Sequence, residues 1–110
     1  MLELFQTEWC PSSRQVRQRL TELGIDYVVR QVSVEREARK ALRAATGTDT
    51  VPALRLEDGS AIIGEERIVA FLDGRFAEPL EAEEQRRKAA KARRRYLEEE
   101  CECSQLAATH

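Results

Sequence analysis

Apolar side chains along the chain fall into four short segments separated by longer, more polar ones. The short segments are rich in β-branched, aromatic and leucine side chains, a composition typical of strands. They predict strands at residues 2–5, 27–32, 53–56 and 61–63. An Asp-Gly pair at residues 58–59 separates the last two strands and favours the tight turn of a β-hairpin.

The longer segments carry apolar residues at helical spacing. Val16, Leu20 and Leu23 follow one another at i, i+4 and i+7, which predicts an amphipathic helix over residues 11–23. Gly24 comes directly after this helix and is a common residue at a helix C-terminus.

Two more helices are predicted in the same part of the chain. Ser33 is suited to cap a helix over residues 35–45, and a third helix begins after Gly64 and ends near Gly74. The inward face of the middle helix is predicted to be Ala38, Ala41, Leu42 and Ala45.

The predicted order of elements is therefore β-α-β-α-β-β-α. A β-α-β unit places its two strands parallel with a right-handed crossover, and the hairpin adds an antiparallel pair. The sequence thus predicts an α/β fold with a mixed four-stranded sheet, formed by residues 1–76. Residues 77–110 are predicted to be a charged helical extension and a tail.

In this extension the pairs Glu83–Arg87 and Glu84–Lys88 are spaced to support a helix over residues 81–100. Its few large apolar side chains are expected to anchor it to the domain or to a second copy: Leu80, Tyr96 and Leu97. Basic clusters at residues 86–88 and 93–95 would suit phosphates, but acidic neighbours favour a solvated, self-paired helix. A helix of this kind would also suit docking of a protein partner.

Composition narrows the function classes. The chain has 110 residues with 18 basic and 20 acidic side chains, so its net charge of −2 argues against a nucleic-acid-binding protein. No apolar run is long enough to span a membrane, and the first residues lack the basic and apolar pattern of a secretory signal. We therefore expect a cytoplasmic protein with reduced cysteines.

Cys10 is the residue with the clearest chemical potential. It lies just before Pro11, at the predicted N-terminus of the first helix, where backbone N–H groups and the helix dipole favour a thiolate. A small packed residue at a strand–helix turn is the alternative interpretation. Elsewhere, Thr50, Val51 and Pro52 directly precede a strand, where a cis Pro52 bond would leave the main chain of Val51 free to pair with an extended peptide or thiol.

These features together resemble a known family. The segments that carry the resemblance are Trp9-Cys10-Pro11-Ser12-Ser13, Thr50-Val51-Pro52 and Gly64-Glu65-Glu66. In this order and spacing they resemble the glutaredoxins and the related N-terminal domain of glutathione transferases, both of which have the thioredoxin fold. The resemblance covers residues 1–76.

The resemblance implies a role for each matching residue. Cys10 would be the nucleophile that attacks a mixed disulfide, and glutathione would be the co-substrate, with no metal. The main chain of Val51, beside a cis Pro52, would bind the cysteinyl part of glutathione, and Trp9 and Pro11 would also contact glutathione. Gly64, Glu65 and Glu66 would hold the γ-glutamyl end, although simple acidic capping of that helix is the alternative for the two glutamates.

Three positions depart from the family pattern. Ser13 replaces the second cysteine, which predicts a single-cysteine mechanism. Thr7 and Asp49 stand where basic residues are common, which predicts weaker glutathione binding unless Arg14 or Arg43 substitutes. The Cys-Gly-Phe-Ser motif of cluster-carrying glutaredoxins is absent, so we expect no iron–sulfur cluster.

The sequence thus predicts a glutaredoxin-like, single-cysteine thiol–disulfide oxidoreductase that acts on glutathione mixed disulfides through Cys10. The alternative is a non-catalytic thioredoxin-fold binding or regulatory module that docks a partner through its C-terminal helix. Trp9 is expected to pack over the loop. Cys101 and Cys103 with His110 make a poor metal chelate, because only one residue separates the thiols, but one of them could resolve an adduct on Cys10.

Overall fold

The computed structural model of the chain describes residues 1–98. Cys101, Cys103 and His110 lie outside the described residues. The roles predicted for them therefore stay predictions. The structure divides into two compact units between Glu78 and Pro79, and each unit is described by itself.

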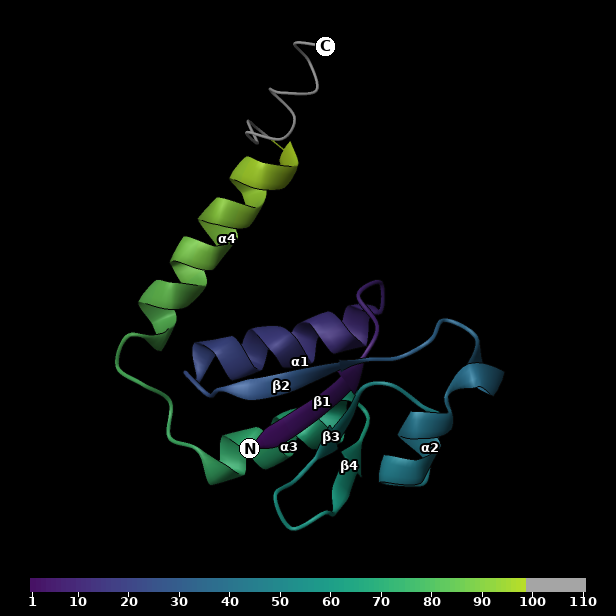
Figure 1. Ribbon diagram of the computed structural model, residues 1–110. Coiled ribbons are helices and arrows are strands. Elements are labelled where there is room, and N and C mark those ends of the chain that lie inside the picture. Colours follow the sequence, from purple (N-terminus) through teal and green to yellow (C-terminus); the bar gives the residue numbers. More distant parts are fainter. Residues whose placement is uncertain (99–110) are drawn as a thin grey trace, which may run out of the picture. The chain divides into compact units, whose positions relative to one another are not determined.

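The first unit is built on a four-stranded sheet with strand order β2-β1-β3-β4 (Figure 1). Strands β1 and β2 run parallel, whereas β3 is antiparallel to both β1 and β4. The elements in chain order are β1 (Leu2–Gln6), α1 (Pro11–Glu22), β2 (Tyr27–Gln31), a 3-10 turn (Arg36–Ala38), α2 (Lys40–Thr46), β3 (Ala53–Arg55), β4 (Ala61–Ile63) and α3 (Glu65–Arg75). The predicted α/β fold with a mixed four-stranded sheet is confirmed.

Helices cover both faces of this sheet, because alternate residues of a strand point to opposite faces. On one face, helices α1 and α3 bury their apolar stripes against β1 and β3. This cluster contains Leu2, Leu4, Val16, Leu20, Leu23, Leu54, Ile68 and Leu72. On the other face, Leu42 of α2 packs against Phe5 and Ala53. Leu4 and Phe5 are neighbours in β1 and belong to different clusters, as this alternation requires.

The predicted second helix over residues 35–45 is wrong in its first half. The chain forms only a 3-10 turn over Arg36–Ala38, and Arg39, with φ −86° and ψ 51°, separates this turn from α2. Ser33 caps no α-helix; its hydroxyl accepts a hydrogen bond from the N–H of Glu35 within its own turn. As a result Ala38 and Ala41 are exposed, whereas Leu42 is buried.

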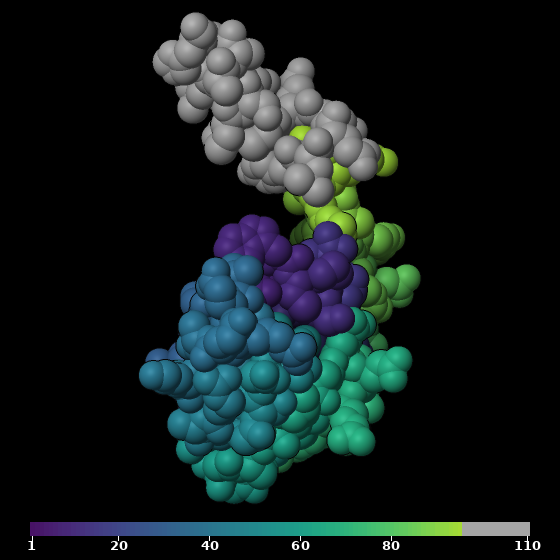
Figure 2. All heavy atoms as spheres, turned by 90° about the vertical axis from the view of Figure 1, so that its right-hand side faces the viewer, coloured from purple at the N-terminus to yellow at the C-terminus, as the bar shows by residue number. Residues whose placement is uncertain are grey.

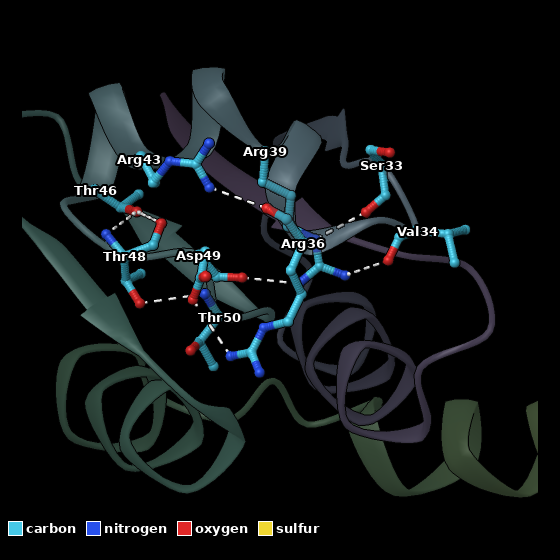
Figure 3. Close-up of polar contacts among 9 residues, drawn as sticks. All are labelled: Ser33, Val34, Arg36, Arg39, Arg43, Thr46, Thr48, Asp49 and Thr50. Atoms are coloured by element: carbon cyan, nitrogen blue, oxygen red, sulfur yellow. Dashed lines mark hydrogen bonds and ion pairs between the residues drawn. The ribbon is translucent and has the colours of Figure 1, made fainter.

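The reason for the break is the side chain of Arg39. Its guanidinium donates hydrogen bonds to the carbonyl oxygens of Ser33 at 2.8 Å, Val34 at 3.3 Å and Asp49 at 2.8 Å (Figure 3). Because these carbonyls accept hydrogen bonds from a cation, they do not need the N–H partners that a helix would provide. The hydrogen bonds from Arg39 therefore stabilise the irregular segment before α2. Helical periodicity alone gives no sign of these contacts.

The second unit contains α4 (Ala82–Glu98), which begins close to the predicted start of the charged helix. Its predicted i,i+4 pair Glu84–Lys88 is present at 3.3 Å. Leu80 was expected to be an apolar anchor but is 100% exposed, and the side chains of Tyr96 and Leu97 lie outside those that the structure describes. None of the helices within residues 1–98 has the length and apolar character needed to cross a membrane.

Candidate functional site

Cys10 is the N-cap residue of α1. Its backbone is extended, with φ −75° and ψ 118°, and Pro11 follows as the first helical residue. The sulfur accepts a hydrogen bond from the backbone N–H of Ser13 at 3.4 Å, the position that a side-chain oxygen takes in an ordinary N-cap. The thiol is half-buried, so it is sheltered and still accessible.

The surroundings of Cys10 favour its charged form. Burial raises the pKa of the thiol, but the hydroxyl and N–H of Ser13, the N–H of Ser12 and the charge of Arg17 lower it. The lowering effects prevail, and the pKa of Cys10 lies below its ordinary value. Because the thiolate is the nucleophilic form of cysteine, these contacts favour reactivity at Cys10.

Ser13 replaces the second cysteine of the family pattern, and it also affects the pKa of Cys10. It is fully buried, and its hydroxyl makes no hydrogen bond within the described residues. Its side chain nonetheless lowers the pKa of the Cys10 thiol, so it favours a negative charge on the sulfur.

The loop before α1 differs from expectation at Trp9. This side chain is 77% exposed, so the prediction that it packs over the loop is wrong. Thr7, in contrast, is buried, and its carbonyl oxygen accepts a hydrogen bond from the N–H of Cys10 at 3.3 Å. The loop is thus closed by its main chain, which leaves the indole ring in contact with solvent.

The Val51–Pro52 segment lies directly before β3, and the bond between the two residues is cis. Pro52 is buried, and its carbonyl oxygen accepts a hydrogen bond from the N–H of Gly64 at 2.9 Å. The main-chain N–H and C=O of Val51 make no hydrogen bond within residues 1–98. They remain available to an extended ligand, as predicted for a main-chain binding site.

The register of the sheet brings the predicted site residues to one end of the first unit. Phe5 pairs with Ala53, and Ala53 pairs with Ile63. The end of β1 leads to Cys10, the start of β3 follows Pro52, and the end of β4 leads to Gly64. All three segments therefore lie at the same end of the sheet. Figure 2 views this side, where purple residues around the start of α1 adjoin the blue residues before α2.

Glu65 and Glu66 form the first turn of α3 at this edge. Glu65 is half-buried and Glu66 is exposed, and neither carboxylate has an ion pair or a side-chain hydrogen bond within residues 1–98. Gly64 before them has φ 94° and ψ 148°, a conformation that other residues rarely adopt. The turn therefore offers backbone N–H groups of a helix N-terminus together with two uncompensated carboxylates.

Asp49 is not the isolated negative charge that the sequence suggested. Its carboxylate forms an ion pair with Arg36 at 3.3 Å, and its carbonyl is bound by Arg39 (Figure 3). Arg43, named above as a substitute cation, donates instead to the carbonyls of Arg36 and Glu37, both at 2.9 Å. Arg36 thus brings an exposed guanidinium to the Thr50–Val51 segment.

Sequence reasoning missed a polar cluster beneath the loop before α1. Gln6 ends β1 and is fully buried, and its side chain contacts Glu8, Arg17 and Gln31. A glutamine at an inward position of an otherwise apolar strand is the one signal that could have indicated it. A separate hollow of about 610 Å³ at the opposite end of the sheet is lined by Ile25, Leu56, Phe71 and other residues, but by none of the predicted site residues.

Comparison with known proteins shows matches to a protein-family model and to solved structures. A protein-family model described as glutaredoxin matches residues 2–62, more than half of the chain. No protein with a curated description matches. Among solved structures, a glutathione S-transferase domain-containing protein from Marinobacter aquaeolei VT8 is 33% identical, with a TM-score of 0.60 over 70% of this chain and 40% of that protein.

Two other solved structures were reported with glutathione bound. A glutathione S-transferase from Methylobacillus flagellatus is 26% identical, with a TM-score of 0.59 over 68% of this chain and 37% of that one. A glutathione transferase homologue from Sulfitobacter, at 23% identity and a TM-score of 0.61 over 79% of this chain and 46% of that one, shows the shared fold alone. The chain thus spans less than half the length of each of these proteins.

Proposed function

Because the chain belongs to the glutaredoxin family, we propose that it is a single-cysteine thiol–disulfide oxidoreductase that acts on glutathione mixed disulfides through Cys10. The observation that carries the proposal is the half-buried Cys10 sulfur at the N-terminus of α1, held by the N–H of Ser13 and shifted toward the thiolate. The glutathione reported in the structure from Methylobacillus flagellatus supports the choice of co-substrate.

The proposed reaction has two exchange steps. The Cys10 thiolate attacks the glutathione sulfur of a mixed disulfide, so that a Cys10–glutathione disulfide forms while the substrate leaves as a thiolate and takes up a proton. A second glutathione thiolate then attacks the glutathione sulfur of this adduct. Glutathione disulfide leaves and Cys10 returns as a thiolate, so the mixed disulfide has been reduced at the expense of one free glutathione molecule.

The lowered pKa of Cys10 serves both steps. In the first step it raises the fraction of attacking thiolate at neutral pH, and in the second it makes Cys10 the better leaving group. Ser13 cannot form a disulfide with Cys10, so release depends on a second thiol. Because Ser13 stands in place of a resolving cysteine, turnover depends on free glutathione.

The binding part of the proposal assigns one group of residues to each part of glutathione. The free N–H and C=O of Val51 would pair with the cysteinyl main chain, as a strand pairs with a sheet edge. The first turn of α3, Gly64 to Glu66, would hold the γ-glutamyl end, where backbone N–H groups suit a carboxylate and the two acids suit the ammonium group. Arg36 would meet the glycine carboxylate, and Trp9 and Pro11 would border the sulfur.

A non-catalytic binding module is the second candidate. The exposed indole of Trp9 beside the thiol favours it, because large exposed aromatic side chains are typical anchors of protein interfaces. In that case Cys10 would form a mixed disulfide with a partner or with glutathione but would not turn over.

The deciding experiment measures turnover of a glutathionylated peptide with free glutathione. We expect activity in the wild type and in a matched control, the Cys101→Ser/Cys103→Ser double variant, and none in Cys10→Ser. A wild-type protein that forms the Cys10–glutathione adduct without turnover would favour the binding module. Activity that persists in Cys10→Ser would refute the proposed mechanism.

A further inference from the structure

A closed set of polar contacts lies beneath the loop that carries Cys10. Gln6, the last residue of β1, is fully buried. Its side-chain amide donates to the carboxylate of Glu8 at 2.9 Å and to the side-chain oxygen of Gln31 at 3.2 Å. The oxygen of the same side-chain amide accepts a hydrogen bond from the guanidinium of Arg17. We call these four residues the Gln6 cluster.

Arg17 is the charged member of this cluster on α1. It lies seven residues after Cys10, and two helical turns return a side chain to nearly the same face. Its side chain is only 21% exposed, and its guanidinium lies 3.8 Å from the carboxylate of Glu8. A partly buried cation needs hydrogen-bond partners to compensate for lost water, and Gln6 supplies one from the end of β1.

The charges around this cation have defined positions. Arg17 lies two turns along α1 from its N-cap Cys10, and its charge lowers the pKa of that thiol, alongside the stronger effects of Ser13 and Ser12. Burial raises the pKa of the Tyr27 hydroxyl on β2, the charge of Arg17 lowers it and that of Glu8 raises it, so Tyr27 stays neutral near pH 7. Among these groups, Arg17 and Glu8 therefore carry the two opposing charges near neutral pH.

We propose that Gln6 is a positioning residue that holds the Arg17 guanidinium toward the start of α1, where its charge stabilises the Cys10 thiolate and Glu8 partly offsets that charge. The inference rests on the proposed role of Cys10 as a thiolate nucleophile. It does not depend on glutathione being the co-substrate, because it concerns the charge on the sulfur alone.

The proposal predicts opposite effects for two substitutions in the same cluster. Arg17→Gln removes the favourable charge and raises the pKa of Cys10, whereas Glu8→Gln removes the opposing charge and lowers it. A purely structural role would make both variants act in the same direction, because each removes a contact of the loop. The sign of the change therefore separates electrostatics from loss of structure.

The test is the rate at which iodoacetamide, an uncharged reagent, alkylates Cys10 as a function of pH, in a Cys101→Ser/Cys103→Ser background. For Arg17→Gln we expect a fall of roughly two- to fivefold in the rate at pH 7, the size typical of one partly exposed charge interaction, and a profile displaced to higher pH. Glu8→Gln should react faster, and Arg17→Lys should retain most of the wild-type rate. Arg14→Gln, an exposed arginine closer to Cys10 on the same helix, is the matched control and should leave the profile unchanged.

Gln6→Leu tests the positioning step. We expect it to displace the profile in the same direction as Arg17→Gln, and the double variant to show no further displacement, because both changes remove one interaction. If urea unfolding shows that Gln6→Leu is not folded, the comparison of Arg17→Gln with Glu8→Gln tests the proposal instead. An unchanged profile in Arg17→Gln, or displacement of both variants in one direction, would overturn the proposal. A wild-type protein without glutathione turnover would refute the proposed function and leave this measurement intact.

Discussion

At Asp49 the chain carries a carboxylate where glutaredoxin-like sequences commonly carry a base, and the guanidinium of Arg36 lies 3.3 Å from it. The pair brings a positive charge to the Thr50–Val51 segment from a position 13 residues earlier in the chain. An exposed ion pair contributes little to stability, so its significance lies in where it places the cation. The position of Ser13 is important in the same way, because its side chain is buried beside the sulfur of Cys10.

The first residue-scale prediction concerns this pair. Arg36→Gln should raise the Michaelis constant for glutathione, because it leaves the Asp49 carboxylate alone near the glycine carboxylate. Asp49→Asn should lower that constant, because it frees Arg36. The free energy of unfolding should change by no more than about 0.5 kcal/mol in either variant. Equal constants in both variants and the wild type would show that glutathione does not contact this pair.

At the scale of elements, the start of α3 depends on the backbone of one residue. Gly64 combines a positive φ of 94° with a hydrogen bond from its N–H to the carbonyl of Pro52 at 2.9 Å. It therefore fixes the first turn of α3 relative to the Val51–Pro52 segment. Gly74 lies within the same helix, where φ is not positive and alanine is the better helix former.

These two glycines make a matched pair for a test. Gly64→Ala should lower the free energy of unfolding by about 1–3 kcal/mol, because its backbone conformation is nearly restricted to glycine, although no neighbour lies within 4 Å of the added carbon. Gly74→Ala, with equal free space, should raise it by about 0.5–1 kcal/mol. Urea unfolding of both variants measures the difference, and a stabilising Gly64→Ala would contradict the argument.

At the scale of the whole molecule, the strands and helices of the thioredoxin-like fold lie within the first unit, Met1–Glu78. Both described core clusters draw their buried residues from this unit, and Arg19 pairs with Glu78 at 3.7 Å at its end. Each segment assigned to the proposed site also lies there. We therefore expect the first unit to fold and react without α4.

A chain ended after Glu78 tests this expectation. It should unfold cooperatively in urea, and its Cys10 should be alkylated at the rate of the full chain. A shortened protein that is folded but has a slower Cys10 would show that residues after 78 belong to the site.

Much of the fold could be predicted from the sequence because its signals are local. Alternating or clustered apolar residues gave the strands, Val16, Leu20 and Leu23 gave α1, and an Asp-Gly pair gave the hairpin. The position of Cys10 before Pro11 likewise indicated a thiol at a helix N-terminus. Each of these signals spans only a few residues, so neighbouring side chains suffice to establish it.

The tertiary structure alone decided the features that join distant parts of the chain. Arg39 breaks the second helix through carbonyls as far away as Asp49, Arg36 neutralises Asp49, and Gln6 holds Arg17 across eleven positions of sequence. None of these contacts has a periodic pattern, because a hydrogen bond between distant residues depends on how the strands align and which side chains the fold buries. The sequence by itself therefore determined which thiol lies at a helix N-terminus, whereas the packing of β1 against α1 and β3 decided which charges surround it.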